Sequence, residues 1–164
     1  MRTNNILSDI NQQNINYQVS VEVQHFPLKS VFRIARGAKV QADVIVVAIT
    51  DGDKTGWAES VPYGRYGESV SSVKSEVLAI ADNPLTDENI DTLIESLPAG
   101  AARNALDCAI WDLRAKQKKM PVRELLSLAD AQPCVTAQTL SIDTPEAMAK
   151  AVQLLDNPPL VKVK

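Results

Sequence analysis

The last thirty residues differ in pattern from the rest of the chain, and this difference constrains the fold most. Cys134 to Ile142 is typical of a strand, and Thr144-Pro145-Glu146 starts a helix, with threonine as N-cap and proline at the first helical position. The helix is expected to run to about Leu155, and Leu160 to Lys164 again has strand character. This order predicts two parallel strands joined by a right-handed crossover. Because two such strands make no stable sheet alone, we expect residues 131–164 to be the first β-α-β of a truncated (β/α)8 barrel.

The first part of the chain alternates in the manner of antiparallel strands. Tyr17 to Phe26 places valines against polar residues, which is typical of a half-buried strand. Val40 to Thr50 predicts a second strand, and Thr55 to Ser60 predicts a third after a turn at Asp51 to Lys54. We therefore expect a three-stranded antiparallel meander with a long excursion, Pro27 to Lys39, between its first two strands.

Helical patterns follow the meander. We expect helices at Glu68–Ala81 and Gly100–Lys118, and shorter ones that start at Thr86-Asp87-Glu88 and at Pro121, the last running to Leu128. The Gly100–Lys118 pattern is the strongest, because its apolar residues recur at helical spacing and form one stripe: Ala102, Ala105, Leu106, Ala109, Ile110 and Leu113. Meander and helices together predict an α+β domain over residues 17–130.

Composition narrows the class of protein. Hydrophobic residues make up 45% of the 164, enough for a packed core, and the net charge of −3 gives no reason to expect nucleic acid binding. No apolar run approaches the ~20 residues of a membrane span, and residues 1–16, which we expect to be a disordered tail, lack the apolar core of a signal peptide. Cys108 and Cys134 form no Cys-x-x-Cys motif, so we expect both to be buried small residues in a cytoplasmic protein.

Two lysines at the end of the chain point to a chemistry. In a strand, Lys162 and Lys164 lie on the same face, roughly 6 to 7 Å apart. Two ammonium groups at that separation disfavour each other's charged form, so one of them can serve as a neutral base. From the residues alone, a solvated strand edge explains the same pair.

Four stretches share motifs with one known family: 27–37, which contains Phe-Arg-Ile-Ala-Arg-Gly; 56–69, which contains Pro-Tyr-Gly-Arg-Tyr-Gly-Glu-Ser; 97–113; and 136–139 with the closing Lys-Val-Lys. Across residues 17–164 the chain resembles the enolase superfamily, muconate-lactonising branch. The segment around Asp107 and Asp112 resembles that branch in general. The first two stretches resemble its L-Ala-D/L-Glu (dipeptide) epimerases.

This resemblance implies a fold and a reaction. It implies a capping domain, residues 17–130, over a modified (β/α)8 barrel, and removal of a proton next to a carboxylate with Mg²⁺ stabilising the enolate. By the same resemblance Lys164 is the base on one face of the α-carbon, and Lys162 is its cationic neighbour, which helps to hold the substrate carboxylate. The family's metal ligands and second catalytic lysine lie on later barrel strands. We therefore expect no metal ligand in this chain and no epimerase activity from the chain alone.

The resemblance also suggests substrate contacts. By the resemblance, Arg33 and Arg36 lie in a loop that closes over the barrel in this family. An arginine there can hold the carboxylate of a glutamate dipeptide with two hydrogen bonds. Of the two, Arg36 is the favoured candidate for this contact. Tyr63 can form a wall of the pocket, and Thr139 is a substrate contact on the first barrel strand. The plainer alternatives are solvated loop charges for the arginines and strand packing for Thr139. His25 matches no role in the family and is expected to be structural.

Two other functions stay open at this point. One keeps the superfamily but changes the reaction, to that of a muconate cycloisomerase or an o-succinylbenzoate synthase. The other is a non-catalytic remnant or a fragment that a barrel chain complements, which predicts exposed apolar faces on the Gly100–Lys118 stripe and on both C-terminal strands. The partners we expect are a dipeptide substrate and either copies of the same chain or that complementing chain, without nucleic acid or membrane.

Overall fold

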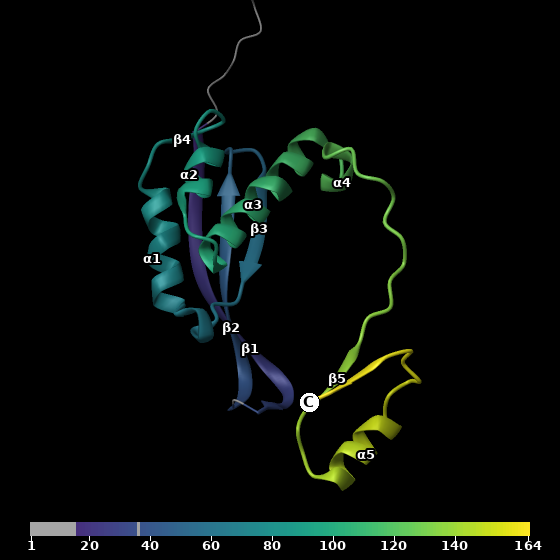
Figure 1. Ribbon diagram of the computed structural model, residues 1–164. Coiled ribbons are helices and arrows are strands. Elements are labelled where there is room, and N and C mark those ends of the chain that lie inside the picture. The colour runs from purple at the N-terminus through teal and green to yellow at the C-terminus, as the bar shows by residue number, and fades with distance from the viewer. Residues whose placement is uncertain (1–15, 36) are drawn as a thin grey trace, which may run out of the picture.

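The computed structural model describes residues 16–35 and 37–164, and its first part is an antiparallel sheet beside three helices (Figure 1). The sheet has the strand order β3-β2-β1-β4, formed by β1 (Asn16–Ile34), β2 (Gly37–Thr50), β3 (Thr55–Ser60) and β4 (Leu85–Thr86). β2 pairs with both β1 and β3, so the predicted meander is confirmed. The two-residue β4, which the residue pattern did not predict, pairs Leu85 with Tyr17. The predicted tail lies outside the described residues, except for Asn16.

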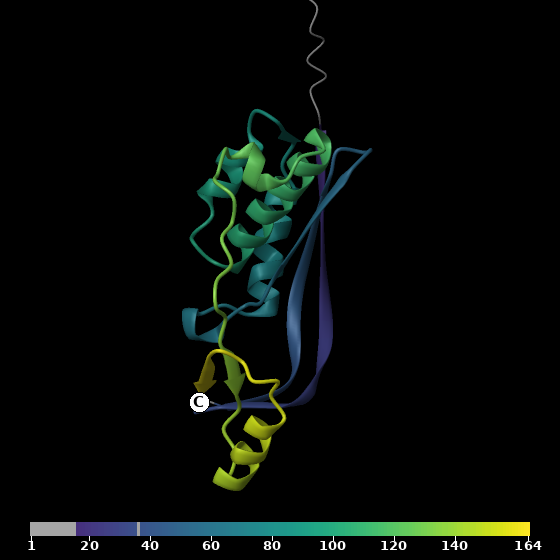
Figure 2. The ribbon, with the colours of Figure 1, turned by 90° about the vertical axis from the view of Figure 1, so that its right-hand side faces the viewer.

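The predicted excursion between the first two strands is wrong. β1 and β2 stay paired as far as Ile34 opposite Gly37, and form one long hairpin in place of a loop. Their register shifts between Pro27 and Phe32, near a proline that has no backbone N–H for the ladder. Toward its end the hairpin bends to the side of the sheet on which the helices lie and runs below them (Figure 2). At the tip, the φ of +147° at Gly37 is one that other residues rarely adopt. The bend carries the end of the hairpin toward the C-terminal part of the chain.

One face of the sheet is covered by three helices, α1 (Val70–Ala81), α2 (Ile90–Ser96) and α3 (Ala101–Lys118) (Figure 2). α3 packs on β2 and β3, and all six residues of its predicted apolar stripe have no exposed surface. They share the core with apolar residues of β2 such as Ile45, Val47 and Ile49. The stripe is therefore core, and the exposed face expected of it in a non-catalytic remnant is wrong.

The remaining helix predictions are corrected mainly at their ends. Ser69 is the N-cap of α1, and its hydroxyl accepts a hydrogen bond from the backbone N–H of Ser72 at 3.1 Å. Thr86 belongs to β4, so the second helix begins only at Ile90. The helix expected from Pro121 to Leu128 is limited to α4 (Val122–Leu125).

The prediction that both cysteines are buried is wrong, because Cys108 and Cys134 are exposed. Cys108 lies on α3, outside the buried stripe, and has a free thiol. Partial burial raises the pKa of this thiol. Cys134 precedes the strand that we expected to include it.

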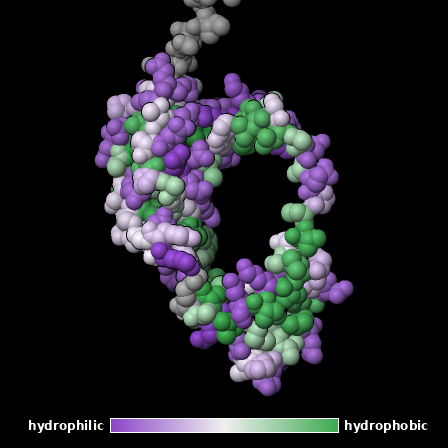
Figure 3. Space-filling view, viewed as in Figure 1, coloured by the Kyte–Doolittle hydropathy of each residue, from purple (hydrophilic) through white to green (hydrophobic). Residues whose placement is uncertain are grey.

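The C-terminal part is the predicted β-α-β unit. It consists of β5 (Gln138–Leu140), α5 (Pro145–Gln153) and β6 (Val161–Val163), and the two strands pair in parallel. Thr144 is the N-cap of α5, and its hydroxyl accepts from the N–H of Ala147 at 3.2 Å. The strands are shorter than predicted. Val163 of β6 is exposed and Leu140 of β5 is buried, so the apolar face expected on both strands is found on β6 and not at Leu140. Apolar residues gather over part of the C-terminal segment (Figure 3).

Within residues 16–35 and 37–164, none of the helices combines the length and the apolar composition that crossing a membrane requires.

Candidate active site

The end of the long hairpin is attached to the end of β5. The backbone N–H of Arg33 donates to the hydroxyl of Ser141 at 3.2 Å, and the backbone N–H of Ile142 donates to the carbonyl of Arg33 at 3.1 Å. Both hydrogen bonds use the backbone of Arg33, and its side chain stays exposed. The hairpin of the α+β domain therefore reaches the β-α-β unit, although the two segments lie far apart in sequence.

Two polar residues lie side by side on the two parallel strands. Thr139 lies directly opposite Lys162 in the β5–β6 pairing. Lys164 follows β6 directly, two residues after Lys162. All three are exposed. The pairing thus brings Thr139 beside Lys162, one of the two lysines that the sequence singled out.

A hollow of about 720 Å³ connects the end of β6 to the α+β domain. Its wall combines three cationic side chains with aromatic and aliphatic ones, and it contains no described acidic residue: Phe32, Ile34, Gly37, Ala38, Lys39, Tyr63, Arg65 and Lys164. Three cations in one hollow favour a ligand with more than one negative charge. The apolar residues leave room for a short carbon chain between the charges.

The hollow includes some of the predicted site residues and not others. Lys164 and Tyr63 line it, whereas Lys162, Thr139 and Arg33 are not among its lining residues. Arg36 lies outside the described residues.

Sequence reasoning missed five side chains of this wall, those of Phe32, Ile34, Ala38, Lys39 and Arg65. Arg65 was the most accessible to prediction, because it stands inside the Pro-Tyr-Gly-Arg-Tyr-Gly-Glu-Ser motif. What the sequence lacked was any sign that this loop meets the end of β6.

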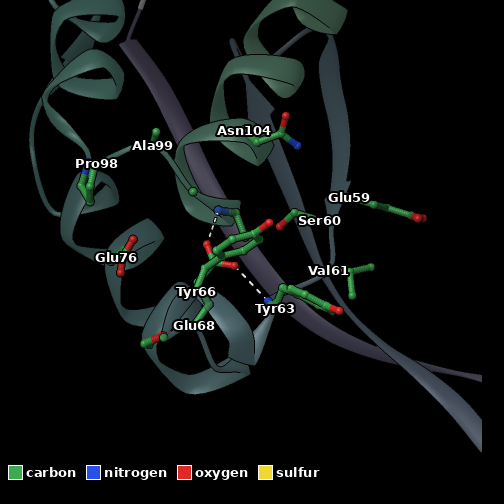
Figure 4. Close-up of a pocket in the computed structure, with 14 residues that line it drawn as sticks. Glu59, Ser60, Val61, Tyr63, Tyr66, Glu68, Glu76, Pro98, Ala99 and Asn104 are labelled. Atoms are coloured by element: carbon green, nitrogen blue, oxygen red, sulfur yellow. Dashed lines mark hydrogen bonds between the residues drawn. The ribbon is translucent and has the colours of Figure 1, made fainter. Parts of the chain in front are cut away.

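The loop that carries Tyr63 and Arg65 is fixed at its base by Glu68 (Figure 4). One oxygen of the Glu68 carboxylate accepts from the backbone N–H of Tyr63 at 2.9 Å, and the other accepts from the N–H of Ala101, the first residue of α3, at 2.6 Å. Within the loop, the rings of Tyr63 and Tyr66 lie 5.6 Å apart, and residues 64–66 form a turn of 3-10 helix. The loop is therefore tied to a helix end rather than held only by its own turn.

A second hollow, of about 740 Å³, lies behind this loop and shares Tyr63 with the first (Figure 4). Its wall includes Glu59, Glu68 and Glu76. The hydroxyl of Ser60 is buried there and has no hydrogen-bond partner among the described residues. The two hollows on either side of Tyr63 therefore differ in charge, because the first is cationic and the second is acidic.

No cluster of His, Cys, Asp and Glu within the described residues could hold a metal ion. Magnesium is therefore not assigned to any of the residues that the structure describes.

An antiparallel sheet with helices on one face, followed by a parallel β-α-β unit, defines a capping domain joined to the start of a barrel. Residues 16–127 match the family described as mandelate racemase / muconate lactonizing enzyme, N-terminal domain. The chain belongs to this family, which confirms the resemblance to the enolase superfamily.

Two curated relatives act on glutamate derivatives, according to their names. The chain is 54% identical over 123 residues to an N-acetyl-D-glutamate racemase from a Pseudoalteromonas species, a match that covers 74% of this chain and 39% of that protein. It is 39% identical over 140 residues to the L-Ala-D/L-Glu epimerase of Escherichia coli K12, covering 84% of this chain and 43% of that protein. The chain thus spans about two fifths of the length of these relatives.

Solved structures show the same relationship. An enolase family member from Agrobacterium tumefaciens with homology to dipeptide epimerases, solved with sodium and L-Ala-L-Glu, has a TM-score of 0.80 and 38% identity, covering 90% of this chain and 45% of that one. A dipeptide epimerase from Enterococcus faecalis, complexed with Mg and L-Leu-L-Tyr, has a TM-score of 0.77 and 28% identity, covering 91% and 45%.

Proposed function

We propose that this chain is the capping domain and first β-α-β of an enzyme that inverts the α-carbon of N-acylated glutamate. The observation that carries the proposal is the hollow in which Lys164, at the end of β6, shares a wall with Arg65 and Lys39 of the capping domain. An N-acylglutamate has two carboxylates joined by a short apolar chain, which fits that wall. The two curated relatives support the proposal, because both names contain an N-acylated glutamate.

In this proposal Lys164 removes the α-proton of the substrate. The proton is very weakly acidic, so the base must be a neutral amine next to the α-carbon, and the developing negative charge must be met by fixed positive charge. Lys162, two residues earlier in the chain, supplies such a charge. The Mg²⁺ and the second lysine expected from the resemblance are assigned to residues outside this chain, and no step is derived through them.

Arg36 and Arg65 are proposed to bind the side-chain carboxylate of glutamate. An arginine can hold a carboxylate with two parallel hydrogen bonds, which makes it selective for a planar anion. Thr139, beside Lys162, is proposed as a further substrate contact, and Tyr63 as a wall of the site. Arg33 is the weaker candidate, because its backbone rather than its side chain makes the described contacts.

The acyl group distinguishes two candidate substrates. The sequence motifs favour an alanyl group, and hence an L-Ala-D/L-Glu epimerase. The 54% identity to an N-acetyl-D-glutamate racemase favours an acetyl group as the second candidate. The cycloisomerase and synthase alternatives have no support from the relatives named above.

The experiment uses the protein expressed from its complete gene, with Mg²⁺, and separates the products by chiral chromatography. The substrates are L-Ala-L-Glu, N-acetyl-D-glutamate and L-Ala-L-Leu, the last as a neutral control. Inversion of either glutamate compound well above that of L-Ala-L-Leu supports the proposal, and the better one identifies the acyl group. Preference for L-Ala-L-Leu, or no inversion at all, contradicts it. The 164-residue chain assayed alone is expected to be inactive.

A further inference from the structure

We infer that Glu68 is a positioning residue that sets the place of Arg65, and so the preference for an anionic substrate side chain. Glu68 is not one of the residues that line the hollow containing Lys164, although it binds the backbone of Tyr63, which is. Its effect passes through the loop of residues 61–67, which lies between the two hollows. The inference rests on the proposed function for the identity of the substrate, and it adds Glu68 to the residues that determine which substrate is preferred.

The contacts of Glu68 are those of a clamp. Its two carboxylate oxygens accept from two backbone N–H groups that belong to separate elements, Tyr63 in the loop and Ala101 in α3. Hydrogen bonds to a charged acceptor are about twice as strong as neutral ones. The N–H of Ala101 is at the start of an 18-residue helix, so it has no partner within the helix itself. A negative charge is favoured at this helix end. The loop is thus attached to the most deeply packed helix of the domain.

Gly100 leaves room for the Glu68 carboxylate, because it has no side chain. Gly100, the N-cap of α3, has extended backbone that any residue can adopt, so its conformation does not require glycine. A Cβ at this position would lie 2.7 Å from the Oε1 of Glu68, closer than real Cβ contacts. Glycine at 100 therefore allows the carboxylate to reach the helix end.

The loop is held on both sides of Arg65. Ser69, the next residue after Glu68, caps α1, so the position of Glu68 is itself held by a helix start. Arg65 lies between the clamped Tyr63 and Glu68, and is exposed. If the clamp opens, the loop stays attached at both ends, but Arg65 is no longer fixed against the hollow.

The first test measures the clamp on this chain without any need for activity. Glu68→Gln keeps one acceptor oxygen, and Gly100→Ala pushes the carboxylate away. We expect amide hydrogen exchange at Tyr63 or Ala101 to become at least roughly tenfold faster in each variant, because a part-buried donor loses a charged partner. Trypsin cleavage after Arg65 should accelerate in parallel. Glu76→Gln, the same change at a glutamate of the same acidic hollow that clamps no element, should alter neither.

The second test measures substrate preference in the protein expressed from its complete gene. Glu68→Gln should raise KM for the glutamate substrate by at least about fivefold, leave kcat within about twofold, and leave KM for L-Ala-L-Leu unchanged. Unchanged exchange at both amides overturns the clamp. Faster exchange with an unchanged ratio of the two KM values overturns the positioning role. If the unaltered protein inverts no N-acylglutamate, the proposed function fails, and exchange and trypsin cleavage still decide whether the clamp exists.

Discussion

Replacing Gly56 by alanine should strongly destabilise the capping domain, because the added methyl group would overlap the backbone of α3. Gly56 of β3 lies against α3, and a Cβ there would be 2.1 Å from the carbonyl oxygen of Ala109 and 2.5 Å from the backbone nitrogen of Leu113. Both atoms are helix backbone, so no side-chain rotation can relieve the clash. α3 would have to retreat by about 1.3 Å, from 2.1 Å to an ordinary contact at 3.4 Å.

The cost follows from what α3 buries. A gap of 0.5 to 1 Å forfeits about a quarter to a half of each dispersion contact across it. Overpacking a core typically costs about 1–3 kcal/mol, and here a buried helix moves as a body, so we expect the upper value, about 3 kcal/mol.

The assay is urea unfolding of the 164-residue chain followed by far-UV circular dichroism. Gly64→Ala is the matched control, because a Cβ at Gly64 meets nothing within 4 Å, and it should change the free energy of unfolding by less than about 0.5 kcal/mol. A loss below about 1 kcal/mol for Gly56→Ala would refute the reasoning, since it would mean that α3 yields easily.

Three further predictions concern single side chains. Arg65→Ala should raise KM for a glutamate substrate about tenfold and leave KM for L-Ala-L-Leu within twofold, as measured by initial rates, because a paired carboxylate loses its partner. Hydrogen bonds, the largest from the Gln117 amide, lower the pKa of Asp51 from 3.8 to about 2, so Asp51 stabilises the fold above pH 4 and loses this effect as the pH falls toward 2. The urea midpoint of Asp51→Asn should therefore fall less between pH 4 and 2 than that of the unaltered chain. Arg114 holds Asp91 with two hydrogen bonds, at 2.8 and 3.0 Å, and Arg114→Lys should cost about 1 kcal/mol in urea unfolding, because lysine cannot form both.

The sequence predicted those parts of the fold in which local pattern and tertiary packing agree. The α3 stripe was predictable because six apolar residues at helical spacing can be buried only together. The β-α-β unit was predictable from the cap at Thr144, which the structure confirms. The hairpin was not, because beyond Pro27 both of its strands are largely exposed and show no alternation between a buried and a wet face.

The candidate site was predictable residue by residue but not as an assembly. Lys164 and Tyr63 could be named from motifs, and the structure places them in one hollow. Arg65 shares this hollow with residues of the hairpin and with Lys164, and the end of the hairpin binds Ser141 through the backbone of Arg33. These are contacts between distant segments, which no local pattern encodes.

The central claim is that Lys164 removes the α-proton of an N-acylglutamate. The most direct test incubates both enantiomers of N-acetylglutamate and both glutamate epimers of L-Ala-Glu with the protein expressed from its complete gene, in D2O, and follows the α-proton signal by NMR. We expect deuterium to enter both isomers of the preferred substrate in the unaltered protein, and Lys164→Ala to abolish its entry into one isomer. Equal incorporation into both isomers by Lys164→Ala would contradict the account.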